Sequence, residues 1–367
     1  MSEFPLGDRL LRMMRRLGTS TCDACLAPQV GVNNAQRVRG ELTNDLKQNV
    51  LRARGRCQSC GAETYVTTVG PGDPFYAELR RRDSVWAALI SAGGPQNLKP
   101  AVIRELKAFG GYQGVWVDAK TTMKADGQPV TVGILHTGIH YPDDLSEDAL
   151  LYHYPDTGRP DKRDEAEVQA TKRAALFGLP IFVITHSENG RSRNVRRAWV
   201  DAWDNDQKCF AISFKAEPIV PLSESTTEDD ERSFALAPGP IRPVSGEREM
   251  RVGQPVFRFS VFRRYGVRCA VCPIQQIEMI QAAHLVGWKA GGNDPRNGLP
   301  LCANHHRAFD AGLFAIEPST KGIHVRAKGP DRRALQITES TIEHLPRFPH
   351  VLALTQRWEE WCQSDAQ

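Results

Sequence analysis

The stretch that decides the fold of this chain is residues 269–310, CAVCPIQQIEMIQAAHLVGWKAGGNDPRNGLPLCANHHRAFD. It contains two sets of residue types that bind metal ions, in interleaved order. The first set has two thiols at the start and a third thiol, with a histidine, near the end: Cys269, Cys272, Cys302 and His305. Ligands arranged as two close pairs are typical of a closed tetrahedral zinc site.

The second set in this stretch consists of nitrogen and oxygen ligands: His284, Asn297, His306 and Asp310. These residue types suit a harder divalent ion and an activated water. His306 and Asp310 are four residues apart, so on a helix they share one face and could hold one ion. A histidine with a pKa near neutrality can take a proton from that water. The second set therefore predicts a hydrolytic site.

The order of these residues resembles that of HNH endonucleases. Residues 257–316 resemble the ββα-metal fold of the zinc-stabilised kind found in McrA-like restriction enzymes. The resemblance implies that His284 ends the first strand and is the general base. It also implies that Asn297 lies in the loop before the helix and orients the base or the metal site. His306, which opens the helix, would bind the catalytic metal.

One position departs from the pattern of that family. Many HNH enzymes carry an aspartate just before the base as a second metal ligand, and here that position is Ala283. Metal binding must then depend on His306, with Asp310. A purely structural zinc finger is the alternative, in which His284 and His306 are ordinary histidines. The cysteine pairs alone fit that alternative, but they do not explain the nuclease spacing of His284, Asn297 and His306, which favours a nuclease.

Length and composition indicate a globular protein. The chain has 367 residues, 41% hydrophobic and 25% charged, which is enough for two or three domains. No apolar run reaches the roughly eighteen residues of a membrane span, and the start lacks a signal-peptide pattern. We therefore expect a cytoplasmic protein without a membrane partner. The net charge of +4 permits a polyanionic partner without requiring one.

A second group of cysteines lies near the N-terminus. Two Cys-x-x-Cys pairs, Cys22 with Cys25 and Cys57 with Cys60, predict a structural zinc site with four thiolates. We expect residues 1–75 to form a zinc-binding basic module. Arginines alternate with Leu and Met over residues 9–17, which predicts a helix with a basic face.

Further basic residues lie between the two cysteine pairs: Arg37, Arg39, Lys47, Arg52, Arg54 and Arg56. One interpretation is that this module binds nucleic-acid phosphates. The other is a structural zinc domain whose arginines form a solvated face, since runs of charge are common on surfaces.

Residues 76–215 predict a mostly-β domain with leading helices. Helical periodicity covers 76–91, 100–109 and 164–177, and Gly or Pro ends each segment. Strand-like segments are 114–118, 130–135, 149–154, 180–185, 197–201 and 208–214. This pattern predicts a small barrel or a curved sheet. Residues 216–250, acidic and rich in Pro and Ser, predict a linker, and 251–367 the HNH nuclease domain with a C-terminal helix.

Residues 110–215 resemble the SRA-type base readers, barrels of the PUA-like superfamily that are fused to HNH nucleases in modification-dependent restriction enzymes. The resemblance implies a flipped, modified base held between aromatic rings and hydrogen-bonding groups. Candidate pocket residues combine aromatic and polar side chains near turns: Trp116, Asp118, His140, Tyr141, Tyr152, Tyr154 and Asp156. Candidate DNA contacts in a basic loop are Arg191, Arg193, Arg196 and Arg197.

Each of these candidates has a structural alternative. The aromatic side chains could be packing residues, and the arginines could belong to an exposed hairpin turn. Asp118 and Lys120 also allow a PD-(D/E)xK nuclease site, although so short a motif arises often by chance.

The sequence as a whole predicts an α+β chain that is a modification-dependent DNA endonuclease of type IV. Its cofactors would be two structural Zn²⁺ ions and a catalytic Mg²⁺, Mn²⁺ or Ni²⁺, and its partner double-stranded, modified DNA. A homodimer would allow both strands to be cut. Two alternatives remain: an HNH nuclease of homing or nicking type that ignores modification, and a non-catalytic zinc-dependent DNA-binding protein, which Ala283 favours.

Overall fold

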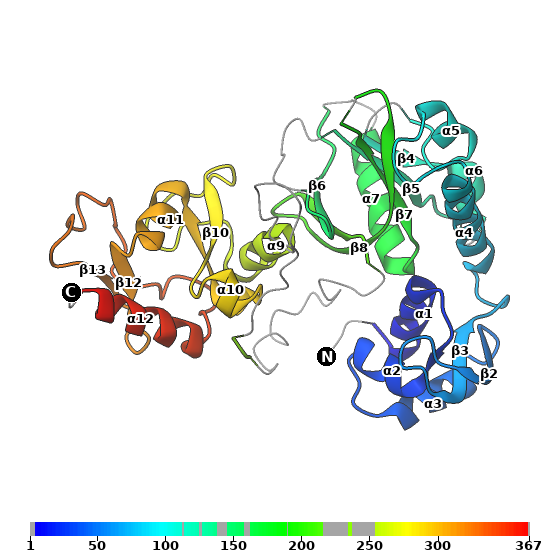
Figure 1. Ribbon diagram of the computed structural model, residues 1–367, viewed down its shortest axis with the longest axis horizontal. Helices are drawn as coiled ribbons and strands as arrows, with labels where there is room; N and C mark the ends of the chain where they lie inside the picture. Colours follow the sequence, from blue (N-terminus) through cyan, green and yellow to red (C-terminus); the bar gives the residue numbers. More distant parts are fainter. Residues whose placement is uncertain are drawn as a thin grey trace. The chain divides into compact units, whose positions relative to one another are not determined.

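The computed structural model describes most of the chain, and its parts are drawn in Figure 1. The described residues are 4–111, 114–124, 127–137, 145–157, 162–188, 190–215, 234–236 and 254–365. Two of the predicted pocket residues, His140 and Tyr141, lie outside them, as does most of the predicted linker. Among the described residues, no helix is both long and apolar enough to cross a membrane.

The chain forms two compact units. The first comprises Met1–Asp144, Tyr152–Trp203 and Cys209–Glu224, and the second Leu145–Leu151, Asp204–Lys208 and Ser225–Gln367. The predicted N-terminal module and the middle domain thus both belong largely to the first unit. The boundary predicted between them stays a prediction.

The first unit begins with a small helical and β-stranded part. Its elements are α1 (Leu6–Leu17), β1 (Thr21–Cys22), α2 (Asp23–Gln29), α3 (Ala35–Thr43), β2 (Val50–Arg56) and β3 (Glu63–Val69). The three strands form one antiparallel sheet in the order β1-β3-β2. Leu10 and Met14 of α1 pack with Leu26, Val38 and Leu42 in its core.

The arginines of α1 do not form the predicted basic surface. Arg12, Arg15 and Arg16 are buried. Arg15 donates from Nε to Asp73 Oδ1 at 3.0 Å, and Arg16 forms an ion pair with Asp201. A buried guanidinium needs such partners because leaving it unpaired costs several kcal/mol, about 3–5. These arginines therefore tie α1 to the rest of the first unit and are not available to phosphates.

The remainder of the first unit is built on a six-stranded sheet. Its strands are β4 (Gly114–Val117), β5 (Thr131–His136), β6 (Ala149–His153), β7 (Ile181–His186), β8 (Arg193–Asp204) and β9 (Cys209–Ser213), and its helices α4 (Tyr76–Ser91), α5 (Pro100–Glu105), α6 (Ala119–Thr122) and α7 (Arg163–Phe177). The strand order is β4-β5-β7-β8-β9-β6, with β5 and β7 parallel. Helix α7 packs against β4 and β5. The predicted helices and strands are present, with α5 shorter and β8 longer than expected.

The predicted barrel is not closed. In the described part of the chain β4 and β6 are the two ends of the sheet and are not hydrogen-bonded to each other. The two end strands are short, with four residues in β4 and five in β6. The hydroxyl of Tyr152 on β6 is 3.9 Å from the position of a Cβ at Gly114 on β4. The sheet is thus strongly curved but open.

The second unit contains a β-hairpin followed by a helix. Strands β10 (Ile280–His284) and β11 (Gly298–Cys302) are antiparallel, with His284 opposite Gly298, and lead into α11 (Ala303–Asp310). Around them lie α9 (Gln254–Tyr265), α10 (Trp288–Gly291), the 3₁₀ helix η2 (Pro295–Asn297), β12 (Phe314–Ile316), β13 (Ile323–Val325) and α12 (Val351–Asp365). The order strand, strand, helix is that of a ββα unit. Phe234 and Leu236 pack against its core.

Candidate active site

The C-terminal cysteine cluster fits a structural zinc ion. The ligand atoms of Cys269, Cys272, Cys302 and His305 lie within 4.8 Å of one another, and all four residues are buried. His305 Nδ1 is 3.0 Å from Cys302 Sγ and 3.6 Å from Cys269 Sγ. Its Nε2 is 2.9 Å from the carbonyl oxygen of Leu335. A proton on Nε2, donated to that carbonyl, leaves the Nδ1 lone pair directed at the thiols, as in many zinc-bound histidines.

The surroundings of this cluster keep its thiols protonated until a cation binds. Burial raises the pKa of Cys269 to about 12, because a thiolate loses hydration there. A bound zinc ion would reverse this effect, since a coordinating thiol is deprotonated. Burial lowers the pKa of His305, which keeps the imidazole neutral and suited to a metal.

Two residues of the cluster belong to the junction between β11 and α11. Cys302 is the last residue of β11 and precedes the first residue of α11, and His305 lies in the first turn of that helix. All three cysteines also belong to the hydrophobic core of this unit. A metal held here would fix the start of α11, the helix that carries His306.

His284 is held by contacts on its face and at one ring nitrogen. It ends β10, as predicted, and its imidazole stacks on Phe257 of α9, with ring centroids 3.8 Å apart and an interplanar angle of 7°. His284 Nε2 is 3.2 Å from Asn293 Oδ1. The opposite residue on β11 is Gly298, where a Cβ would lie 2.7 Å from the Phe257 ring. Glycine therefore allows the close approach of α9 that supports the stack.

Asn297 acts on the backbone beyond His284. Its side chain is fully buried; Oδ1 accepts from Val286 N at 3.0 Å, and Nδ2 donates to Val286 O at 2.9 Å and Gly292 O at 3.3 Å. Its carbonyl accepts from Leu285 N at 2.9 Å. We expected Asn297 in the loop before the helix, but it lies directly before strand β11. Asn297 thus fixes, through backbone contacts, the loop that follows His284.

His306 lies between two oxygen-bearing side chains. Its Nε2 is 3.5 Å from Asp310 Oδ2, so the two side chains lie on one face of α11. Its Nδ1 is 2.8 Å from Oε1 of Gln281, a residue of β10 that we did not predict. Gln281 is exposed, whereas Ala283, at the position where the resemblance places an aspartate, is buried in the core.

The nitrogen of His306 and the carboxylate of Asp310 fit a divalent cation of the Mg²⁺ or Mn²⁺ kind. The Asp310 side chain is 66% exposed, so such an ion would keep open positions for water and substrate. Among the described residues, no third His, Cys, Asp or Glu side chain joins this pair to form a larger group of ligands. A cation bound here would therefore take more of its ligands from water than an ion in either cysteine cluster.

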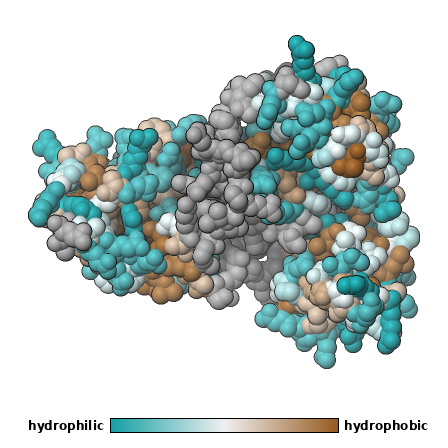
Figure 2. Space-filling model, viewed as in Figure 1, coloured by the Kyte–Doolittle hydropathy of each residue, from teal (hydrophilic) through white to brown (hydrophobic). Residues whose placement is uncertain are grey.

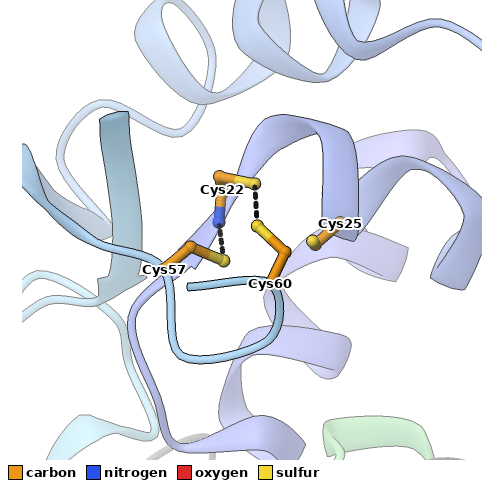
Figure 3. Close-up of side chains that lie close together, drawn as sticks. All are labelled: Cys22, Cys25, Cys57 and Cys60. Atoms are coloured by element: carbon orange, nitrogen blue, oxygen red, sulfur yellow. Dashed lines mark hydrogen bonds between the residues drawn. The ribbon is translucent and has the colours of Figure 1, made fainter. Parts of the chain in front are cut away.

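The N-terminal cysteines also converge, as Figure 3 shows. The sulfur atoms of Cys22, Cys25, Cys57 and Cys60 lie within 4.8 Å of one another, which fits a four-thiolate zinc site. Cys22 Sγ and Cys60 Sγ are 3.8 Å apart, and the Cys22 amide donates to Cys57 Sγ at 3.3 Å. Burial alone would raise the pKa of Cys57, but the amides of Cys22, Cys60 and Ser59 outweigh it and lower this pKa to about 6.

The three predicted aromatic pocket residues that the structure describes are at least partly buried. Trp116 packs edge-on against Phe109, with ring centroids 6.4 Å apart, and belongs to the margin of the core. Tyr154 packs against Phe210 at 4.6 Å. Burial, with a smaller effect of Glu167, raises the pKa of Tyr152. In the described part of the sheet these rings have the packing role that was the structural alternative.

The predicted polar contacts are also dispersed. Asp118 precedes α6 and Asp156 is exposed. Among the arginines, Arg196 lies over the ring of Phe214 at 4.6 Å, and Arg197 pairs with Asp83 at 2.6 Å. Arg193 donates to two nearby carbonyls and lines a cavity of about 110 Å³, while Arg191 is exposed. Arg193, Arg196 and Arg197 thus each have a partner within the fold.

A hairpin that ends in a restrained histidine, followed by a helix with a histidine beside an aspartate, is the arrangement of the ββα-metal class of nucleases. Residues 269–317 match the family model HNH_2, described as HNH endonuclease. The chain therefore carries an HNH endonuclease domain, and the enzyme is an endonuclease.

Among solved structures, the chain is similar to "Modification dependent TagI restriction endonuclease", at 19% identity over 72% of this chain and 90% of that one, with a TM-score of 0.28. It is also similar to "Structure of the Type IV phosphorothioation-dependent restriction endonuclease ScoMcrA", at 13% identity over 99% and 96%, with a TM-score of 0.23. A third, "crystal structure of KRYPTONITE in complex with mCHH DNA, H3(1-15) peptide and SAH", has 12% identity over 57% and 41%, and a TM-score of 0.22. These scores are too low to define the fold. No curated protein matches the chain.

Proposed function

We propose that this protein is a modification-dependent DNA endonuclease. The second unit would hydrolyse a phosphodiester bond, and the first unit would select the site. The observation that carries the nuclease part is the ββα unit itself, in which β10 carries the stacked His284 and α11 carries His306 beside Asp310.

In this proposal His284 is the general base. The stack on Phe257 fixes the plane of its ring, and the contact with Asn293 limits rotation within that plane. A neutral imidazole restrained in this way takes a proton from the attacking water at low cost in entropy. Asn297 keeps the loop after His284 in place and so maintains the position of the base.

His306 and Asp310 would hold a divalent cation, which when bound supplies the positive charge that phosphodiester hydrolysis requires. Gln281 accepts the Nδ1–H of His306, so that Nε2 is directed toward Asp310 and the ion. The glutamine thereby supports metal binding from β10 by orienting the imidazole.

The resemblance of residues 110–215 to SRA-type readers supports a role for the first unit in reading a flipped, modified base. One HNH site cuts one strand, so a double-strand break requires two chains or two encounters with DNA. We therefore include a homodimer on modified, double-stranded DNA in the proposal, and a cytoplasmic location, where that substrate is met.

The test is cleavage of matched plasmids, unmodified or carrying 5-methylcytosine, hydroxymethylcytosine, methyladenine or phosphorothioate, with Mg²⁺, Mn²⁺ or Ni²⁺. We expect one modified plasmid to be cut and the unmodified plasmid to stay intact. His284→Ala is the control for a contaminating nuclease. Absence of cutting on every plasmid, with both zinc sites filled, would overturn the nuclease proposal.

A second candidate is an HNH endonuclease that does not depend on modification. The packing of Trp116 against Phe109 and of Tyr154 against Phe210 favours it, because a ring packed in this way is less free to stack on a flipped base. Equal cutting of all the plasmids would establish this candidate and remove base reading from residues 110–215.

A further inference from the structure

The hairpin of β2 and β3 has a face of alternating arginines. Arg52, Arg54 and Arg56 occupy every second position of β2, so their side chains lie on one side of the sheet. Their partners on β3 are, in order, Thr67, Tyr65 and Glu63. β2 is at the edge of the three-stranded sheet, and on the side of the molecule drawn in Figure 2 much of this N-terminal part is hydrophilic.

The three arginines differ in how their charge is used. Arg52 is neutralised by Asp23, with guanidinium-to-carboxylate distances of 2.6 Å, and also donates to Thr67. Arg54 and Arg56 are exposed and, within the described residues, form no hydrogen bond or ion pair. Glu63, which lies opposite Arg56, is therefore not paired with it. Two cationic groups of this face thus remain available to a partner.

Tyr65 lies between the guanidinium groups. The carbon centres of the Arg52 and Arg54 guanidinium groups lie 5.5 and 5.6 Å from the centre of its ring, and the residue is 49% exposed. An exposed aromatic ring flanked by arginines is the arrangement that proteins use to contact nucleic-acid strands. The ring also limits the motion of Arg54, which reduces the entropy lost on binding.

The zinc cluster holds this hairpin in shape. Cys57 follows Arg56 directly, and the guanidinium of Arg56 extends back to Gly61, where a Cβ would lie 3.7 Å from its Nη2. The Cys57 amide donates to the Ala62 carbonyl at 2.9 Å, and the Gly61 amide to the Cys57 carbonyl at 2.8 Å. The two free arginines are therefore displayed from a fixed turn.

We propose that Arg54, Arg56 and Tyr65, here called the arginine–tyrosine face, bind the sugar-phosphate backbone of duplex DNA. Arginines two positions apart on a strand are separated by roughly 6.6 Å, which allows each to contact a separate phosphate of one DNA strand. Phosphate contacts add affinity and orientation without reading sequence. The inference rests on the proposed action on DNA but concerns a surface separate in sequence from the HNH domain.

The experiment measures DNA binding in the full chain carrying His284→Ala, so that cleavage does not interfere. Binding of an unmodified duplex is followed by fluorescence anisotropy over a series of salt concentrations, with Arg54→Ala/Arg56→Ala added. We expect affinity to fall on the order of tenfold or more near 0.1 M salt. The slope of log K against log salt should decrease by about 2, one unit for each lost phosphate contact.

Two controls separate charge from structure. Arg37→Ala/Lys47→Ala removes the same charge from exposed positions on α3 and the turn after it, and should leave the slope unchanged. Arg54→Lys/Arg56→Lys keeps the charge and should restore most of the slope. Zinc content must stay constant in all variants.

An unchanged slope in Arg54→Ala/Arg56→Ala, or an equal loss in both alanine pairs, would overturn the inference, as would a parent chain that binds no duplex. Equal or tighter binding of single-stranded RNA through this face would assign it to another partner. Plasmid cleavage by the chain with His284 intact is scored separately. Cleavage with an unchanged slope rejects only the face, whereas no cleavage by that chain rejects the proposed function.

Discussion

The two cysteine clusters have similar ligands but very different surroundings. The C-terminal cluster lies within the hydrophobic core of its unit, and all of its residues are buried. The N-terminal cluster packs with Val66 alone in a small core, with Cys25 half-buried and Cys60 exposed. One cluster is therefore part of the catalytic fold, whereas the other supports a hairpin at the surface.

One thiol of the N-terminal cluster differs from the rest. Burial raises the pKa of Cys269 to about 12 and also raises that of Cys22 and Cys25, whereas backbone amides, against the effect of burial, lower that of Cys57 to about 6. A thiol in the C-terminal core needs a cation to ionise, while the N-terminal turn already stabilises one thiolate. We therefore expect loss of metal to damage the second unit more than the first.

The largest effect should come from Cys302→Ser, which removes a ligand at the junction of β11 and α11. Structural zinc binding contributes apparent free energies of about 10–16 kcal/mol in small zinc domains, so we expect the HNH domain to unfold and cleavage to be lost. Zinc analysis, thermal unfolding and plasmid cleavage measure this. Cys60→Ser is the matched change in the other cluster and should leave the unfolding transition of the HNH domain in place. Equal damage by both would contradict the difference between the clusters.

His284→Ala should separate chemistry from folding within the second unit. We expect cleavage to fall about 100- to 10,000-fold, the usual effect of removing a general base, with zinc content and thermal unfolding unchanged. His324→Ala on β13, a histidine of the same unit beside Glu317, is the control and should cut normally. Retained cleavage in His284→Ala would assign the base to another residue.

Breaking the buried pair of Arg16 and Asp201 tests what holds the N-terminal part in the first unit. Arg16→Met leaves Asp201 buried without its cation, and such changes cost about 3–5 kcal/mol of unfolding free energy. Urea denaturation followed by tryptophan fluorescence measures the loss. The double variant Arg16→Met/Asp201→Leu should recover part of it, because no unpaired charge remains. If the loss of unfolding free energy were smaller than that for an exposed ion pair, the zinc site, and not the arginines of α1, would hold the N-terminal part in the first unit.

The smallest effect expected is that of Gln281→Ala. Loss of a group that orients a metal-binding histidine lowers metal affinity about 10- to 100-fold. Mn²⁺ binding, measured by electron paramagnetic resonance, should weaken while both zinc sites stay filled, and Gln281→Glu should retain binding. If Gln281→Ala bound Mn²⁺ with unchanged affinity, Gln281 would not orient His306, and Asp310 would be sufficient to do so.

The sequence predicted the HNH unit well because its ligands lie in one short stretch. Cys269 to Asp310 contains both sets, and their spacing fixes the hairpin and the helix. The arginines of α1 were misassigned because their partners, Asp73 and Asp201, are far away in the chain. A basic helix face and a set of buried ion pairs have the same local pattern, and only the tertiary fold distinguishes them.

The aromatic candidates show the same limit. Tyr152 and Tyr154 alternate along β6, which is consistent with either a pocket wall or packing. Gln281 was missed for another reason. Its contact with His306 joins residues 25 positions apart, and an amide is not one of the residue types that the metal-ligand pattern contains.

His305 and His306 are adjacent residues that serve different centres, one inside the core and one beside Asp310. Successive side chains on a helix are rotated by about 100°, and that rotation alone separates the two tasks. The number of residues between Cys302 and Asp310 is therefore more strictly constrained than the identity of many residues in that segment. Exposed positions such as Asn304 can change in kind, but one inserted or deleted residue would turn one of the two histidines away from its ligands. Variation in this segment should consist of replacements and not of changes in length.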